Sequence, residues 1–247
     1  MPEAFQPIAV RPPSDNRFFF WLRCLVDLQL LTIYQYLSGK LPSLQGRVLD
    51  VGAGQAPWRE LLRKAEYVGV DVDTAGSFGM CRKAEVSYYD GRHLPFEDGS
   101  VDHVLCTEVL EHVPDPAGLL SEIGRVLRKG GGLILTVPWS ARLHHLPNDY
   151  YRFTPAALDA LLESAGFERT TISVRGNDIA VVANKLLVLL IRLLNPSDRL
   201  HILWTWTFAV LLAPITIGFL GAAHAALFLN CGSREDPLGY GVSAVKR

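Results

Sequence analysis

Apolar and polar positions alternate in blocks through the central part of this chain, from residue 47 to residue 174. Short apolar runs of strand length are separated by longer segments in which apolar residues recur at helical spacing. This alternation is typical of a parallel sheet with crossover helices, so we expect an α/β fold. Strands are predicted at 47–51, 67–72, 101–107, 132–137 and 169–174, with a weaker one near 85–88, and helices at 57–65, 116–128 and 155–165.

Capping residues support two of these helix boundaries. Thr154 and Pro155 suit the N-cap and the first position of the helix at 155–165, and Gly166 follows directly after its end. The three glycines at 130–132 predict the end of the preceding helix and the turn into the next strand.

An amphipathic helix is expected before the first strand. Apolar residues recur at helical spacing over 18–37, interrupted by Arg23, Asp27 and Gln29. No small-residue cleavage site follows this run, so we predict no secretory signal. The helix is expected to pack on the domain or cover its pocket, and the alternative is an anchor at a membrane surface.

The composition changes abruptly within residues 175–237, here called the insertion. Its second apolar segment, 203–229, contains 27 residues without Asp, Glu, Lys or Arg, which is long enough to cross a bilayer as a helix. After it, residues 239–245 have the pattern of one more strand that closes the sheet. The first apolar segment, 179–194, is interrupted only by Asn184, Lys185 and Arg192.

That closing strand constrains the insertion, which must leave the sheet and return on the same side. Two membrane arrangements satisfy this condition. One is a helical hairpin through the bilayer. In the other, slightly favoured, Pro214, Gly218 and Gly221 break the longer segment, and the first helix lies on the lipid surface with Lys185 and Arg192 at the headgroups. A buried helical pair or a dimer interface is the alternative.

Two successive strand ends carry residues suited to a nucleoside pocket. Asp50 precedes Gly52 and Gly54, whose missing Cβ atoms let the backbone approach a ligand closely. Asp71 ends the next strand, where a carboxylate can accept hydrogen bonds from ribose hydroxyls. A carboxylate within the glycine turn repels a pyrophosphate but attracts the sulfonium and ammonium charges of S-adenosylmethionine. Asp50 therefore favours S-adenosylmethionine over NAD.

The order and spacing of several motifs resemble those of the class I S-adenosylmethionine-dependent methyltransferases. The matching segments are Val48–Gly54, Gly69–Asp73, Asp90–Val104, Glu108–Val113 and Leu127–Leu133. The resemblance implies a Rossmann-like, doubly wound, seven-stranded and mostly parallel sheet with helices on both faces. The corresponding domain limits are 1–44 for the N-terminal segment and helix, 45–174 for the cofactor-binding core, 175–237 for the insertion and 238–247 for the final strand.

The resemblance also implies where the cofactor binds. Asp50 would contact its methionine end, Asp71 the ribose hydroxyls, and Asp90 the adenine. The position of the third glycine often found in the first motif is taken by Ala56, which is still small. Alternatively, Asp50 and Asp71 only cap helices. The full predicted set is Asp50, Gly52, Gly54, Asp71, Val72, Asp90, Gly91 and Thr107; the polar cluster Glu108, Glu111 and His112 is either beside the pocket or a helix cap.

The loop at 138–154 leaves the carboxyl end of the fifth strand and is expected to lie over the reactive methyl group. His145 is the predicted general base, oriented by Asp149, with His144 as the second candidate. Alternatively, these side chains only stabilise the loop, with Arg152 paired to Asp149. The remaining candidates are Tyr150 for catalysis, and Trp139 and Arg152 for binding the substrate, Arg152 through an acidic or phosphate group.

Composition narrows the classes of partner. The net charge of −1 and the absence of a Lys- and Arg-rich run argue against nucleic acid. The four cysteines, Cys24, Cys81, Cys106 and Cys231, form no CxxC pair, so we predict no metal site and no disulfide framework. They suit a reducing cytosol.

Together these features predict an enzyme that methylates a small-molecule, lipid or lipid-linked acceptor with S-adenosyl-L-methionine. It would act on the cytosolic face of a membrane, contacted through residues 179–229. A non-catalytic membrane adaptor that keeps the fold, and a soluble methyltransferase that dimerises through the insertion, stay open as alternatives. The acceptor atom is open among oxygen, nitrogen and carbon.

Overall fold

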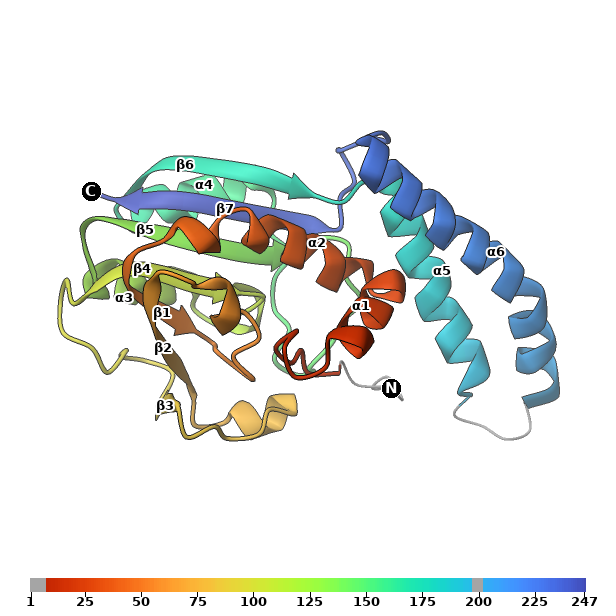
Figure 1. The fold of residues 1–247 in the computed structure, drawn as a ribbon, viewed down its shortest axis with the longest axis horizontal. Coiled ribbons are helices and arrows are strands. Elements are labelled where there is room, and N and C mark those ends of the chain that lie inside the picture. The colour runs from red at the N-terminus through yellow and green to blue at the C-terminus, as the bar shows by residue number, and fades with distance from the viewer. Residues whose placement is uncertain (1–7, 197–201) are drawn as a thin grey trace.

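A single twisted sheet of seven strands organises the chain, as a computed structural model covering residues 8–196 and 202–247 shows (Figure 1). The strand order is β3-β2-β1-β4-β5-β7-β6, and only β7 runs antiparallel to its neighbours. The predicted α/β sheet is therefore confirmed. The strands are β1 (Gly46–Val51), β2 (Ala65–Val72), β3 (Val86–Tyr89), β4 (Val101–Thr107), β5 (Leu127–Pro138), β6 (Phe167–Arg175) and β7 (Gly239–Lys246).

Helices cover both faces of this sheet and also extend beyond its edge. One apolar layer joins the sheet to α3 and α4, and a second joins it to α1, α2 and the turn η2. The helices are α1 (Arg17–Val26), α2 (Leu28–Ser38), α3 (Pro116–Val126), α4 (Pro155–Ser164), α5 (Asp178–Leu194) and α6 (Ile202–Leu229), with 3-10 turns η1 (Leu41–Ser43), η2 (Arg59–Leu61), η3 (Ala75–Phe78) and η4 (Leu110–His112).

The single N-terminal helix predicted over 18–37 is wrong, because Asp27 divides it into α1 and α2. The backbone of Asp27 leaves helical geometry (φ −94°, ψ 85°), and its carboxylate accepts the Leu30 N–H and so caps α2. Arg23, in the last turn of α1, pairs with the same carboxylate at 3.1 Å. As a result α2 packs on the sheet while α1 turns away and exposes apolar side chains, namely Phe18, Phe19, Trp21, Leu22, Leu25 and Val26.

The helix predicted at 57–65 is also wrong, because only the short turn η2 forms there before β2 begins. Ala56 adopts a left-handed conformation (φ 53°), which extends the turn after β1. Trp58 is buried in the layer that contains α2. Helix α2 already covers this face of β1. The segment that connects β1 to β2 therefore contributes only Trp58 and Leu61 to the apolar layer beneath α2.

The other boundaries agree with the sequence to within a few residues, except that β5 begins at Leu127 and not at 132 as predicted. Thr154 caps α4 by accepting the Ala157 N–H, as predicted. Helix α3 ends at Val126, two residues earlier than expected, since β5 begins at Leu127 and contains the glycines at 130–132.

The insertion forms a hairpin of two long helices, α5 and α6, which pack side by side and project from the edge of the sheet (Figure 1). The favoured arrangement with a broken second segment is wrong, because α6 is one continuous helix that includes Pro214. A proline in a helix removes one hydrogen bond and can bend the helix without ending it. Small buried side chains of both helices, Ala180 and Ala183 of α5 and Ala223 of α6, belong to one apolar cluster.

Most of α6 outside this contact is exposed. The stretch Trp204–Leu229 is long and apolar enough to cross a membrane, and 17 % of its most apolar part is buried. Residues 1–7 and 197–201, which belong to the predicted N-terminal segment and to the insertion, lie outside the described residues.

Candidate functional site

A cavity of about 1730 Å³ opens at the carboxyl ends of β1, β2 and β4. Pockets for a single small ligand usually measure about 300–1,000 Å³, so this cavity can hold two ligands of that size together. One end is formed by the strand ends and the glycine turn. The other end is formed by α5 and by the facing sides of α1 and α2.

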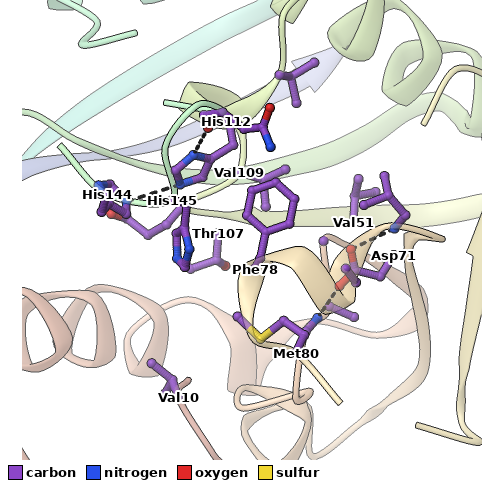
Figure 2. A pocket seen from close by; sticks show the side chains of 18 of the residues that line it. Val10, Val51, Asp71, Phe78, Met80, Thr107, Val109, His112, His144 and His145 are labelled. Atoms are coloured by element: carbon purple, nitrogen blue, oxygen red, sulfur yellow. Dashed lines mark hydrogen bonds between the residues drawn. The ribbon is translucent and has the colours of Figure 1, made fainter. Parts of the chain in front are cut away.

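The glycine turn after β1 is held by Asp71. One oxygen of this carboxylate accepts the Gly54 N–H at 2.8 Å, and the other accepts the Val72 N–H at 2.7 Å (Figure 2). At Gly52 the φ angle is 75°, and a Cβ atom would clash with the side chain of Val109. Burial raises the pKa of Asp71. A carboxylate has about four lone-pair sites, so Asp71 can hold the turn and still accept from a ligand.

Asp50 is the most deeply buried carboxylate in the glycine-turn end of the cavity. It is 2 % exposed and accepts a hydrogen bond from the Tyr67 hydroxyl at 2.9 Å. Burial raises the pKa of Asp50 to about 7, against the opposing effect of the Tyr67 bond, and nearby Asp71 adds to the rise. A cation in the cavity would favour the ionised form of this carboxylate.

The structure brings the whole predicted cofactor set to one cavity. Asp90 is exposed at its rim, and its carboxylate accepts the backbone N–H groups of Arg92 and His93, which lower the pKa of Asp90. The Thr107 hydroxyl is buried without a hydrogen-bond partner among the described residues. The cavity is lined by Asp50, Gly52, Gly54, Asp71, Val72, Asp90, Gly91 and Thr107.

Three histidines gather beside this set, two from the loop after β5 and one from η4 (Figure 2). The ring centroids of His112 and His144 are 4.7 Å apart, and that of His145 lies 5.4 Å from His112 and 5.3 Å from His144. The Phe78 ring packs against His145 at 5.4 Å. All four side chains line the cavity. Burial lowers the pKa of each histidine, and that of His144 falls to about 4.

Two glutamates stand next to the histidines. Glu111 is fully buried, and neither of its carboxylate oxygens has a hydrogen-bond partner among the described residues. Burial, together with the charge of Glu108, raises the pKa of Glu111 well above its usual range. Glu108 itself lies at the end of β4 and forms an ion pair of 2.8 Å with the buried guanidinium of Arg175.

The predicted pairing of Asp149 with His145 is wrong. The Asp149 carboxylate accepts the backbone N–H of His144 at 2.9 Å and lies 3.3 Å from Nδ1 of that ring. The same carboxylate holds Arg152 through two bonds, of 2.6 and 2.9 Å. The structure therefore gives Arg152 an internal partner, as in the alternative reading of this loop, and offers no support for a contact with the substrate.

Tyr150 and Trp139, the two remaining candidates of the loop, lie in different surroundings. Tyr150 lines the cavity, with its hydroxyl donating to the Asn148 side chain at 3.1 Å. Trp139 is not among the residues that line it; its ring packs on Tyr240, with centroids 6.2 Å apart. Trp139 thus belongs to the packing of β5 on β7.

Several lining residues were not predicted. Phe78 and Met80 come from the segment after β2, which has no motif that indicates a binding role. One side of α5 also reaches the cavity, although its composition indicated a membrane segment or, alternatively, a buried helical pair or a dimer interface. Those α5 residues are Asn184, Leu187, Val188 and Ile191.

Comparisons with known proteins agree on the core. Residues 49–135 match the methyltransferase domain family. The ubiquinone biosynthesis O-methyltransferase of Psychrobacter arcticus is 33 % identical over 155 residues, which are 51 % of this chain and 60 % of that protein. The chain therefore spans about three fifths of this relative's length.

Solved structures resemble the chain over most of its length. An S-adenosylmethionine-dependent methyltransferase from Thermotoga maritima superposes with a TM-score of 0.55 at 18 % identity, over 94 % of this chain and 96 % of that one. A second, from Archaeoglobus fulgidus, gives 0.53 at 19 % identity, over 94 % and 100 %. At such identities the likeness establishes the Rossmann-like methyltransferase fold.

Proposed function

This chain carries a class I S-adenosylmethionine-dependent methyltransferase domain, and we propose that it transfers a methyl group to an oxygen atom of a small acceptor with an apolar tail. The transfer would take place at a membrane surface. The observation that carries this proposal is the two-ended cavity, with buried carboxylates at a glycine turn at one end and an apolar helix at the other.

The glycine-turn end suits S-adenosylmethionine. The α-ammonium and the sulfonium of this cofactor are both cationic, and Asp50 is a buried carboxylate whose hydrogen bonds include no cationic partner within residues 8–196 and 202–247. The carboxylate of Asp71 lies where a ribose would present its hydroxyls, at the end of the second strand. Asp90 at the rim suits the adenine. Charge and position thus agree with the family's cofactor.

The cofactor supplies, when bound, a methyl group on a positively charged sulfur. The protein's main contribution to such a displacement is to align acceptor, methyl and sulfur. His145 and Tyr150 lie in the loop over the cavity, on the acceptor side. His145 stays the predicted proton acceptor for a hydroxyl, from its place in this loop. The name of the Psychrobacter arcticus relative supports an oxygen acceptor.

The far end of the cavity suits an apolar tail. There α5 contributes Leu187, Val188 and Ile191, and Leu30 and Ile33 of α2 also line the cavity. A tail held between these helices would place its polar head at the histidines. Quinone-type lipids and lipid-linked sugars both have this form.

Two exposed apolar surfaces support a membrane location. Side chains of α6 such as Trp204 and Phe228 are 72 % and 89 % exposed, and α1 exposes Phe18, Phe19 and Trp21. The two helices are joined where the His224 ring of α6 donates to the Leu25 carbonyl of α1 at 2.9 Å. Patches of this kind mark contacts with lipid or protein. We place the protein on the cytosolic face, with the cations of α5 toward the headgroups.

Calorimetric titration tests the cofactor assignment. Detergent-purified protein is expected to bind S-adenosylmethionine and S-adenosylhomocysteine, and not NAD. Asp71→Ala should abolish this binding, whereas Asp159→Ala, on the exposed side of α4, should keep it. Thermal denaturation of each variant separates lost binding from lost folding. A protein that binds none of the three ligands contradicts the proposal and favours a non-catalytic membrane adaptor.

A further inference from the structure

Three potential metal ligands meet beside the acceptor end of the cavity. Glu111, His112 and His144 each offer an atom within 4.8 Å of the others. We propose that these three side chains bind a divalent transition-metal ion, of which zinc is the most suitable probe. Glu111 and His112 come from η4, and His144 comes from the loop after β5.

The first argument comes from the tautomers of the two histidines. Nδ1 of His112 lies 2.6 Å from the Asn148 carbonyl oxygen, and Nδ1 of His144 lies 3.0 Å from the Arg142 carbonyl oxygen. A carbonyl only accepts, so each Nδ1 carries the ring proton in the neutral imidazole. Both Nε2 atoms are then unprotonated, yet they face each other at 3.2 Å. A cation between them resolves the repulsion of the two lone pairs.

The second argument comes from Glu111. This side chain is fully buried, and neither oxygen has a hydrogen-bond partner in the described part of the chain. A buried polar group without a partner is rare and costs free energy. Its Oε1 lies 3.6 Å from Nε2 of His112, on the same side as the histidine pair. An ion would satisfy the carboxylate and both nitrogens at once.

Two of the three separations between ligand atoms are close to those of zinc coordination, and the third is at most 4.8 Å. Zinc binds imidazole nitrogen and carboxylate oxygen at about 2.0–2.2 Å, so two ligand atoms in a tetrahedral site are separated by about 3.3 Å. The observed separations are 3.2 Å between the nitrogens and 3.6 Å between nitrogen and oxygen. Two histidines and one carboxylate leave a coordination position open, as in catalytic zinc sites.

The surroundings support the ligands in the manner of known metal sites. Metal-bound histidines usually donate their other ring N–H to a carbonyl or a carboxylate, which fixes the ring. Here the Asn148 carbonyl serves His112, while the Arg142 carbonyl and the Asp149 carboxylate, at 3.3 Å, lie at Nδ1 of His144.

An ion at this site would face the cavity, because His112 and His144 both line it. An acceptor oxygen at the open position would be polarised there, and metal coordination lowers the pKa of a bound hydroxyl. This role rests on the proposed function. The binding of the metal does not, and it is tested without substrate or cofactor.

Metal content provides the first test. Chelator-treated protein is dialysed against zinc, and the bound metal is counted per chain by mass spectrometry. We expect close to one ion per chain in the wild type, and at least ~100-fold weaker zinc binding in His112→Ala and in His144→Ala. His93→Ala is the matched control, because that ring is 84 % exposed and lies outside the proposed site. Circular dichroism verifies that each variant folds.

Cobalt substitution provides the second test, since exposed Cys81 and Cys231 can also attract zinc. The proposed nitrogen and oxygen site gives cobalt d–d bands without the charge-transfer band of a thiolate ligand. Wild-type protein that retains no zinc overturns the proposal. So does zinc binding that survives in the His112→Ala/His144→Ala double variant. Titration of S-adenosylmethionine into the same samples separates failure of the metal site from failure of the proposed function.

Discussion

The two ends of the cavity are built in different ways. The cofactor end is formed by Asp50 and Asp71, on the adjacent parallel strands β1 and β2, and by Gly52 and Gly54 in the turn after β1. The Gly52 N–H donates to the Val70 carbonyl, and the Gly54 N–H donates to the Asp71 carboxylate. The acceptor end is formed by side chains from η4, the loop after β5, and the helices α1, α2 and α5. The comparison shows that backbone geometry defines the cofactor end, whereas convergence of distant side chains defines the acceptor end.

The largest effect is expected from adding a single methyl group to the cofactor end. In Gly52→Ala the new Cβ clashes with Val109, and we expect S-adenosylmethionine affinity to fall at least ~100-fold by calorimetry. Gly79→Ala is the matched control: its φ of 76° is almost the same, but its Cβ meets nothing within 4 Å. If the two variants bind equally well, the close backbone approach is not what defines this end.

At the acceptor end, the largest effect is expected from His145→Ala. Turnover should fall at least about 100-fold while the affinity for S-adenosylmethionine stays unchanged, because the ring lies over the acceptor and outside the glycine turn. Single-turnover rates and calorimetry measure the two quantities separately. Unchanged turnover would mean that His145 is not the general base and only packs against Phe78.

The charge of the cofactor end predicts a dependence on pH. Because the pKa of Asp50 is raised to about 7, this carboxylate becomes neutral as the pH falls below that value. The affinity for the cationic cofactor should then decrease by up to about tenfold per pH unit. Asp50→Asn should bind weakly at every pH, without this slope. A wild-type affinity that is constant from pH 8 to pH 5.5 contradicts this role of Asp50.

The same carboxylate has the opposite effect on the stability of the ligand-free protein. The folded-state pKa of Asp50 lies above the unfolded value, so the folded state binds more protons and stability decreases as the pH rises from about 4 to about 7. Asp50→Asn should therefore be more stable than the wild type at pH 8, by on the order of 1–3 kcal/mol. Chemical denaturation at pH 4 and pH 8 measures this difference.

The smallest effect concerns the membrane that would supply the acceptor. In Trp204→Ser/Trp206→Ser, two exposed aromatic side chains of α6 are lost, and we expect roughly tenfold weaker sedimentation with phosphatidylglycerol vesicles. Val174→Ser, an exposed apolar position on β6, should bind the vesicles as the wild type does. If the wild-type protein does not bind vesicles and forms a dimer in solution, the exposed surface of α6 is a protein interface.

The cofactor end could be predicted from the sequence because each of its parts is a short, local motif. A glycine turn and two strand ends are local patterns, and parallel pairing of neighbouring strands brings them together. The closing strand at 239–245 could be predicted for the same reason, from its own alternation. The break at Asp27 was missed because one acidic residue in an apolar run also fits a helix interior, and only its caps to α1 and α2 distinguish the two.

The acceptor end could be predicted only in part. The loop at 138–154 was expected over the site, but spacing along the chain does not say which histidine Asp149 faces. The juxtaposition of His112 with His144 depends on how η4 packs against that loop, 32 residues away. A metal site was not predicted because the cysteines form no CxxC pair and because Glu111, His112 and His144 have no recognisable metal-ligand spacing along the chain. A break at Pro214 was predicted because proline cannot donate a helical hydrogen bond, but in α6 it lies within one continuous helix.

Methyl transfer to extracted lipids tests the two-ended cavity most directly. Protein is incubated with S-adenosylmethionine labelled in its methyl group and with a membrane lipid extract, and the label in the organic phase is counted. The account predicts label with the wild type, none with Asp71→Ala, and a marked loss with Val188→Lys, which places a charge in the α5 end of the cavity while cofactor affinity stays unchanged. Wild-type protein that binds the cofactor and leaves the organic phase unlabelled would contradict it.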